Sequence, residues 1–225
     1  MFLMHLKKGY EFMSKNTFEI SIFNRFIKRL FDIVFSFLGL VATWWIILMV
    51  YLIILFKYRE SGFYIQTRVG LNEKEFKIIK LKSMRNIMGY ETTVTIEDDP
   101  RITPVGKFIR KTKIDELPQL INVLKGDMSF VGPRPDVKDV IYSLNDFERK
   151  IYTSIRPGIT GPATLKYRNE EELLNLVKNP EQYSKEVIFR DKYEINKKYI
   201  KNYSFKKDIE YILQTVFTNS ETVKV

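Results

Sequence analysis

The sequence contains no cysteine and only one histidine. The absence of cysteine excludes a disulfide framework, a thiolate zinc site and a cysteine nucleophile. The single histidine, His5, lies in the polar N-terminal stretch away from every motif, so histidine-based acid–base catalysis and histidine-ligated metals are not expected. A P-loop and a GxGxxG dinucleotide fingerprint are also absent. Any catalysis must therefore use carboxylates, lysine, hydroxyls, arginine and a hard metal such as Mg²⁺.

The charge balance points to an anionic partner. Lysine and arginine number 37 against 27 aspartate and glutamate residues, which gives a formal net charge of +10 over 225 residues. Nucleic acid, an acidic membrane surface and a phosphorylated substrate all agree with this charge. Of these three partners, nucleic acid has the least support, because the sequence contains no nucleic-acid-binding motif. A membrane-tethered nucleic-acid binder is therefore the weakest hypothesis.

One uncharged run, residues 33–56, indicates a membrane segment. Its 24 residues would form a helix of roughly 36 Å, against a hydrocarbon core of about 30 Å. A buried helix of a soluble protein and a cleaved signal peptide are weaker alternatives for a run this long. We expect an N-terminal leader at 1–24, a membrane-embedded helix at 25–57, a cytoplasmic domain at 58–216 and a C-terminal tail at 217–225.

Both flanks of this run are basic, and lysine and arginine mark the cytoplasmic side of a membrane helix. A helix that enters and returns on one face keeps both flanks in the cytoplasm, whereas a spanning helix exports one of them. The flanks thus favour a re-entrant helix, with Gly39 and Thr43 as its only soft points. The basic residues are Lys7, Lys8, Lys15, Arg25, Lys28 and Arg29 before the run, and Lys57, Arg59, Arg68, Lys74 and Lys77 after it.

The remaining patterns predict an α+β fold that is mainly α-helical. Two short strands around Gly70-Leu71-Asn72 read as a β-hairpin. Pro104 opens a helix through about Arg110, and a second helix is expected from Ile114–Leu117 to Leu124, with Gly126 as its C-terminal cap. Turn-rich residues 86–100 suggest a mobile loop. The C-terminal region has an apolar helix face that could pack on the core or lie at a membrane interface; its residues include Tyr211, Ile212 and Val216.

Two adjacent carboxylates, Asp115 and Glu116, stand before Pro118 in the stretch KIDELPQ. Helix capping explains them in part, since the start of a helix favours negative charge. The same position would keep a carboxylate ionised beside a polyanion and offer a second carboxylate to Mg²⁺. Capping and catalysis both remain open from this stretch alone.

Arginines between prolines and glycines form two stiff loops. Arg134 lies between Pro133 and Pro135 in GDMSFVGPRP, and Arg156 opens RPGITGPA. A guanidinium presented from a rigid loop suits a bidentate phosphate contact, although an ordinary surface turn has the same sequence.

Taken in order, the membrane run, TRVG, RITPVGKFIRKTKIDELPQLINVLKGDMSFVGPRP and RPGITGPA resemble the bacterial sugar transferase family over about residues 25–216. These are small monotopic phosphoglycosyl transferases, with a re-entrant helix followed by a cytoplasmic catalytic domain that carries amphipathic interfacial helices. The resemblance implies transfer of a sugar 1-phosphate from a UDP-sugar to undecaprenyl phosphate with release of UMP. It also places the protein in the bacterial cytoplasmic membrane, with Mg²⁺ as cofactor and membrane lipids as partners.

By position in the motifs, the resemblance makes Asp115 the nucleophile that holds the phosphosugar covalently, and Glu116 a catalytic residue and Mg²⁺ ligand. It makes Arg110, Arg134 and Arg156 contacts to substrate phosphates or the nucleotide. The family's re-entrant helix has a Ser-Pro break where this chain reads Thr43-Trp44-Trp45, which leaves re-entrant and spanning helices as alternatives. An inactive membrane-anchored scaffold of glycan assembly is the alternative function. The sequence predicts neither the sugar nor the glycan pathway, and it leaves a homo-oligomer open.

Overall fold

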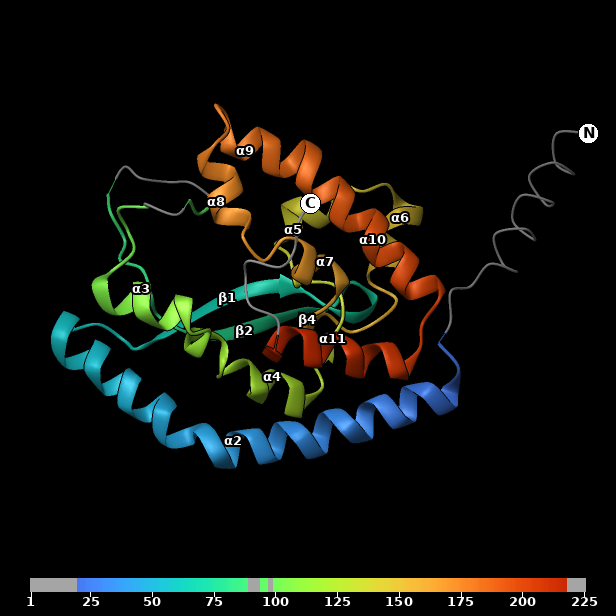
Figure 1. The fold of residues 1–225 in the computed structure, drawn as a ribbon, viewed down its shortest axis with the longest axis horizontal. Helices are drawn as coiled ribbons and strands as arrows, with labels where there is room; N and C mark the ends of the chain where they lie inside the picture. The colour runs from blue at the N-terminus through green and yellow to red at the C-terminus, as the bar shows by residue number, and fades with distance from the viewer. Residues whose placement is uncertain (1–19, 89–93, 97–98, 218–225) are drawn as a thin grey trace, which may run out of the picture.

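The structure, a computed structural model, describes residues 20–88, 94–96 and 99–217. Helices dominate it, and two small sheets lie among them (Figure 1). The expected leader falls almost wholly outside the described residues, as do most of the tail and part of the loop at 86–100. The mainly helical α+β prediction is confirmed in its architecture, with one long apolar helix at the N-terminal end of the described chain.

This helix, α2 (Ile22–Tyr58), forms the base of the molecule in Figure 1. It begins where the Ser21 side chain accepts a hydrogen bond from Asn24 N, and it ends where Arg59 adopts a left-handed conformation with φ 54°. Its length and composition would allow it to cross a membrane. Its outward side chains are large, apolar and exposed along most of the helix, as expected for a surface that meets lipid rather than water.

Polar contacts hold the first half of α2 to the rest of the chain. Lys28 Nζ lies 2.5 Å from Asp208 Oδ2, and both side chains are buried. Asp32, one turn further on, accepts hydrogen bonds of 3.0 Å from Ser129 Oγ and from Phe130 N. Buried charges in a membrane-side helix are stable only when they are paired in this way.

Apolar packing holds the second half of α2. Ile47, Val50 and Ile54 are buried in one cluster with Leu81 and Ile109. Both halves of the helix therefore pack on the same body of protein, and in Figure 1 both ends of α2 turn up toward the other elements.

Gly39 and Thr43 lie in the middle of α2, where it passes α4 (Gln119–Lys125). Thr43 Oγ1 donates a 2.7 Å hydrogen bond to the Gly39 carbonyl, a contact that bends helices. A Cβ added to Gly39 would lie 3.1 Å from a methyl carbon of Leu120, so glycine allows the two helices to approach. α2 runs as one helix through Thr43-Trp44-Trp45 and curves in Figure 1 without a proline break.

The predicted hairpin is confirmed. Strands β1 (Phe63–Val69) and β2 (Glu75–Leu81) pair antiparallel, with Phe63 opposite Leu81. Between them, η1 (Leu71–Glu73) makes the turn, with positive φ at Asn72 and Glu73.

The predicted helix from Pro104 is α3 (Pro104–Lys111), capped by the Thr103 hydroxyl, which accepts from Gly106 N at 2.9 Å. The second predicted helix differs from expectation. A 3₁₀ turn, η2 (Ile114–Glu116), comes first, and α4 begins only at Gln119. Gly126 caps α4 as predicted, at φ 96°, a conformation that L side chains rarely adopt.

A second, parallel pair of strands joins the two arginine-proline loops. β3 (Ser129–Val131) pairs with β4 (Gly158–Thr160), and Gly158 N donates to Pro133 O at 2.8 Å. A Cβ on Gly158 would lie 2.1 Å from Gly132 N, so only glycine permits this approach of the two backbones.

Further helices complete the fold; most of them cover the upper side in Figure 1, whereas the last one lies lower, next to α2. In the final helix, α11 (Phe205–Phe217), Tyr211 and Ile212 pack against the core, which agrees with the first predicted role. Val216 is exposed, as the second role, contact with a membrane interface, would require. The remaining elements are α5 (Lys138–Ile141), α6 (Asp146–Tyr152), α7 (Pro162–Lys166), α8 (Glu170–Asn175), α9 (Pro180–Tyr183), η3 (Ser184–Ile188), α10 (Phe189–Lys201) and α11 (Phe205–Phe217).

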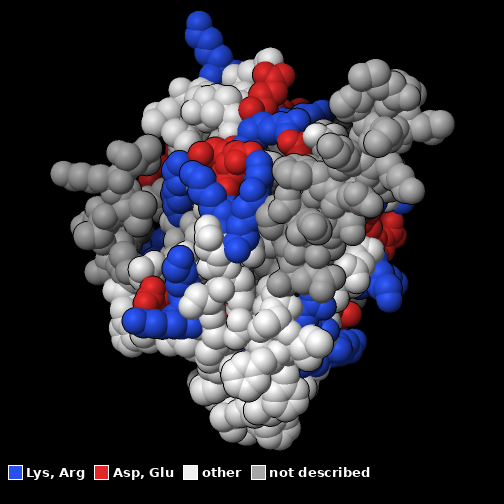
Figure 2. Space-filling view, turned by 90° about the vertical axis from the view of Figure 1, so that its right-hand side faces the viewer, with Lys and Arg blue, Asp and Glu red and all other residues white. Residues whose placement is uncertain are grey.

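On the face shown in Figure 2, charged and uncharged side chains lie at different heights. The lower end of that face, the level at which α2 lies in Figure 1, is uncharged, and lysine, arginine, aspartate and glutamate gather above it. This separation is the pattern expected of a protein whose base is immersed in lipid.

Candidate active site

Glu116 is held by two cations. Its Oε1 accepts from Lys80 Nζ at 2.9 Å and from Arg134 Nη2 at 3.2 Å. Lys80 comes from β2 and Arg134 from the loop after β3, so three segments far apart in sequence meet at this carboxylate. The side chains of Glu116 and Lys80 are only 13% and 18% exposed, so their contact is weakly screened, whereas the Arg134 side chain is 44% exposed and its contact is screened more.

These two contacts favour the ionised form of Glu116. Burial alone would raise the pKa of Glu116, but Lys80 and Arg134 outweigh it and hold that pKa well below its usual range. Glu116 in return raises the pKa of Arg134. Glu116 is thus ionised over the physiological pH range.

Asp115 is buried beside this pair, with 6% of its surface exposed. Burial raises the pKa of Asp115 above the ordinary value, and the charge of Glu116 raises it further against the opposing effect of Lys80. Its Oδ1 has no hydrogen-bond partner in the described chain. An unpaired, desolvated carboxylate oxygen is more nucleophilic than one held by donors.

The expectation that a helix start keeps Asp115 ionised is wrong. Asp115 belongs to a three-residue 3₁₀ turn whose first-turn N–H groups do not reach its Oδ1, and α4 starts four residues later. The low pKa belongs to Glu116, and its causes are two side chains rather than a helix dipole.

Arg110, from the last turn of α3, lies near Asp115 and lowers its pKa to a small extent. Its Nη2 contacts Glu171 Oε1 at the start of α8, and its Nη1 contacts Ser83 Oγ at 3.4 Å. The Arg110 guanidinium is therefore already paired with a carboxylate in the absence of substrate. A phosphate group that binds Arg110 through Nη2 would compete with Glu171.

Replacing Glu171 with glutamine is expected to improve binding of a phosphate-containing donor. Loss of the negative charge frees Arg110, so KM for the donor should fall roughly two- to fivefold with kcat little changed, since the Glu171 side chain is 44% exposed. Steady-state kinetics on the two variants measure this. Glu172→Gln is the matched control, because Glu172 lies in the same turn and is exposed. An unchanged or raised KM for Glu171→Gln would show that this carboxylate does not compete with substrate.

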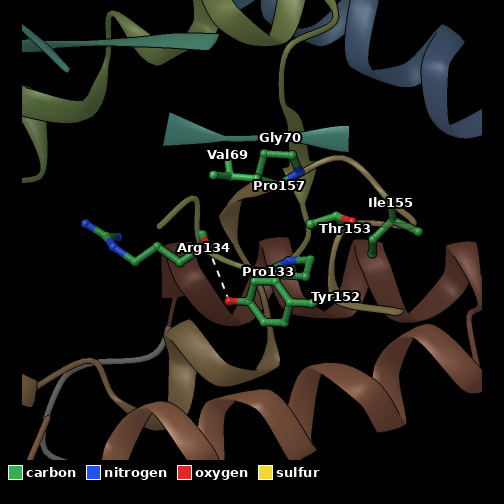
Figure 3. A pocket seen from close by; sticks show the side chains of 8 residues that line it. All are labelled: Val69, Gly70, Pro133, Arg134, Tyr152, Thr153, Ile155 and Pro157. Carbon is green, nitrogen blue, oxygen red and sulfur yellow. Dashed lines mark hydrogen bonds between the residues drawn. The ribbon is translucent and has the colours of Figure 1, made fainter. Parts of the chain in front are cut away.

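Hydrogen bonds from Tyr152 hold the backbone of the loop that carries Arg134. Tyr152 donates its hydroxyl to Asp136 Oδ2 at 3.1 Å and lies 3.4 Å from the Arg134 carbonyl. Figure 3 shows Tyr152 on one wall of a small pocket behind this loop, with the Arg134 side chain extending away from the pocket. The guanidinium is thus free to reach Glu116 while its backbone stays fixed.

Arg156 lies elsewhere. Its Nε donates to Gly126 O at 2.8 Å, at the C-terminal end of α4, whereas Asp115 and Glu116 precede the N-terminal end of that helix. The structure thus brings together Asp115, Glu116, Arg110 and Arg134, and it places Arg156 beside Arg29 of α2.

Within the described ranges, no group of three or more histidine or acidic side chains is arranged to hold a metal. Mg²⁺ often binds through one or two carboxylates together with substrate phosphates, and the present residues fit that arrangement. Both cations contact Glu116 through Oε1, and Asp115 contributes an unpaired oxygen.

Sequence reasoning did not identify Lys80 or Glu171 as site residues. Lys80 stands among the apolar residues of a strand, in KIIKLKS, a pattern that signals a buried charge needing a partner. Glu171 belongs to a run of three glutamates with no such signal.

The sequence is similar to those of several known proteins. A family described as bacterial sugar transferase matches residues 23–221. The exopolysaccharide production protein ExoY of Sinorhizobium fredii is 33% identical over 221 residues, which cover 91% of this chain and 90% of that protein. The undecaprenyl-phosphate galactose phosphotransferase of Salmonella typhimurium is 36% identical over 85% of this chain, and the aligned part is 40% of that protein. The UDP-glucose:undecaprenyl-phosphate glucose-1-phosphate transferase of Escherichia coli is 35% identical over 86% of this chain and 40% of its own length.

Proposed function

This chain belongs to the bacterial sugar transferase family, and we propose that it transfers a sugar 1-phosphate from a UDP-sugar to undecaprenyl phosphate and releases UMP. The observation that carries the proposal is the buried, unpaired Asp115 carboxylate beside Glu116, with arginines on either side. Further support comes from two relatives whose names give undecaprenyl phosphate as the substrate.

In this proposal Asp115 attacks the phosphorus atom next to the sugar. A bond forms between its carboxylate oxygen and phosphorus, and the bond from phosphorus to the UMP oxygen breaks, with the electron pair leaving on UMP. A phosphate oxygen of undecaprenyl phosphate then attacks the same phosphorus and releases the Asp115 carboxylate. The product is a lipid-linked diphosphosugar.

Two anions must approach each other in both steps, so positive charge has to offset the repulsion. Arg110, which lies near Asp115, and Arg134, which contacts Glu116, are proposed to bind the diphosphate. Bound Mg²⁺ would neutralise phosphate charge, with Glu116 Oε2 and Asp115 as its protein ligands. Lys80 keeps Glu116 ionised and oriented for this role.

The helix α2 is proposed to enter and leave the membrane on one face. Supporting this, Lys28 near its start and Ile54 near its end both pack against the same domain, and the helix curves at Gly39 and Thr43. The active site then lies on the cytoplasmic side of the bacterial inner membrane, where the phosphate of the acceptor is at headgroup level. In this chain a side-chain-to-backbone hydrogen bond would replace the Ser-Pro break.

The pH dependence of the reaction should reflect Asp115. Only its ionised form is a nucleophile, and its pKa is raised, so kcat/KM should fall with decreasing pH sooner than for an ordinary aspartate. A pH profile of UMP release measures this, with each sample assayed again at neutral pH to exclude acid inactivation. A profile that stays flat down to about pH 4, the ordinary pKa of aspartic acid, would contradict the assignment.

The function itself is tested with the purified full-length chain, Mg²⁺, undecaprenyl phosphate and a panel of UDP-sugars. We expect UMP release with at least one sugar, and that sugar identifies the donor. Failure to release UMP from any donor, with the glycan assembly of cells still disrupted by deletion of the protein, would favour an inactive scaffold instead.

A further inference from the structure

A cluster of arginines lies at the end of α4 opposite to Asp115. Arg29 of α2 donates to the carbonyls of Val123 and Leu124 at 2.7 and 2.8 Å. Arg156 donates from Nε to the Gly126 carbonyl at 2.8 Å. A Cβ added to Gly126 would lie 3.2 Å from Arg29 Nη2, so the two guanidinium groups converge on this glycine.

Arg25 completes the arginine cluster, which we define as Arg25, Arg29 and Arg156. It lies four residues before Arg29 on α2, hence on the same face of that helix. Arg25 and Arg29 both interact with Arg156, and together with its burial they lower the pKa of Arg156. Three positively charged side chains thus lie close enough to repel one another.

Within the described part of the chain, none of the three arginines of this cluster forms a salt bridge with a carboxylate. Asp32 of α2 attracts Arg29 and Arg156 without contacting them, but it is one carboxylate against three arginines, is 2% exposed and already accepts hydrogen bonds from Ser129 and Phe130. The two terminal nitrogens of Arg156 make no hydrogen bond with the described residues. Donors and positive charge therefore remain for an external anion.

The surroundings of the cluster are those of a membrane surface. On α2 the neighbouring side chains Phe23, Phe26 and Leu30 are large, apolar and exposed, and the uncharged run begins at Ile33. Figure 2, which views the molecule from the side where α2 begins in Figure 1, shows blue side chains directly above the uncharged lower end. Arginines beside an exposed apolar surface of this kind are suited to lipid headgroups.

We propose that the arginine cluster binds the phosphate headgroup of an anionic phospholipid. The site is separate from the proposed catalytic centre, since the seven residues of α4, about 10 Å of helix, lie between Gly126 and the turn that carries Asp115. A lipid bound there would hold the first half of α2 and the end of α4 at a fixed depth in the membrane. The proposal concerns binding and does not depend on the sugar transfer reaction.

The test is native mass spectrometry of the full-length protein in detergent with added phosphatidylglycerol or phosphatidylcholine. We expect wild type to retain phosphatidylglycerol in preference to phosphatidylcholine. Arg156→Gln should weaken retention roughly tenfold or more, since it removes two charged donors. Arg25→Gln, at an exposed position, should weaken it roughly two- to fivefold. Lys57→Gln is the matched control, because Lys57 flanks the other end of α2.

Equal loss in Lys57→Gln and Arg156→Gln would overturn the proposal, because it would indicate general attraction to basic flanks. Equal retention of the two lipids would also overturn it. Displacement of phosphatidylglycerol by millimolar inorganic phosphate would assign the cluster to free phosphate, and displacement by equimolar undecaprenyl phosphate would assign it to the acceptor; either result contradicts a phospholipid site. Thermal midpoints of all variants establish that each is folded, and Arg25→Gln keeps the test valid if Arg156→Gln is not.

Discussion

Replacing Asp115 with asparagine should reduce UMP release by on the order of 10⁴-fold or more. Asparagine has the same shape as aspartate and suits a buried site, but its amide is not a nucleophile that can accept a phosphosugar. The charge contacts of Glu116 with Lys80 and Arg134 should persist in the variant. The protein should therefore fold and still bind the donor while the first chemical step fails.

The measurement is single-turnover UMP release from the identified donor, together with donor binding by calorimetry. Asp139→Asn is the control, because Asp139 is an exposed carboxylate in α5. An Asp115→Asn variant with a rate near that of wild type would exclude Asp115 as the nucleophile and, with it, the proposed mechanism.

The second large effect concerns stability. Lys28→Met should destabilise the protein by about 3–5 kcal/mol, because it leaves the Asp208 carboxylate buried without its cation. Among the described residues, the hydroxyls of Tyr199 and Tyr203 then remain to donate to it. For a chain of this length the loss corresponds to a fall in thermal midpoint of about 6–20 °C.

Thermal unfolding in detergent, followed by tryptophan fluorescence at a fixed scan rate, measures this fall. Lys57→Met, at the opposite end of α2, is the control and should change little. The double variant Lys28→Met/Asp208→Leu should recover part of the loss, since it removes the unpaired charge. A midpoint for Lys28→Met within about 2 °C of wild type would show that this ion pair does not anchor α2.

Local signals in the sequence predicted the elements that depend on local physics. The apolar run predicted α2, Gly126 predicted the end of α4 because its positive φ disfavours other residues, and alternation predicted the hairpin. The start of α4 could not be placed in the same way. The left-handed Lys113 and the 3₁₀ turn that follows it are determined by packing of η2 against β2, which no nearby residue signals.

In the candidate site, too, some features depend on local sequence and others on residues that the fold brings together. One short motif marked Asp115 and Glu116 as candidates, with helix capping as an open alternative. The pKa shifts of both depend on Lys80, and that of Glu116 also on Arg134, which the fold brings from other elements. Arg134 and Arg156 look alike in sequence, with each arginine next to proline. The parallel pairing of β3 with β4 aligns their backbones, yet one side chain reaches Glu116 and the other reaches Gly126.

The most direct test of the double-displacement account is intact mass spectrometry of the full-length protein after incubation with its UDP-sugar and Mg²⁺, without undecaprenyl phosphate. The account predicts a mass increase equal to one sugar phosphate, with one equivalent of UMP released, and no increase in Asp115→Asn. UMP release that requires the acceptor, with no adduct on the protein, would contradict it and indicate direct transfer between the two substrates.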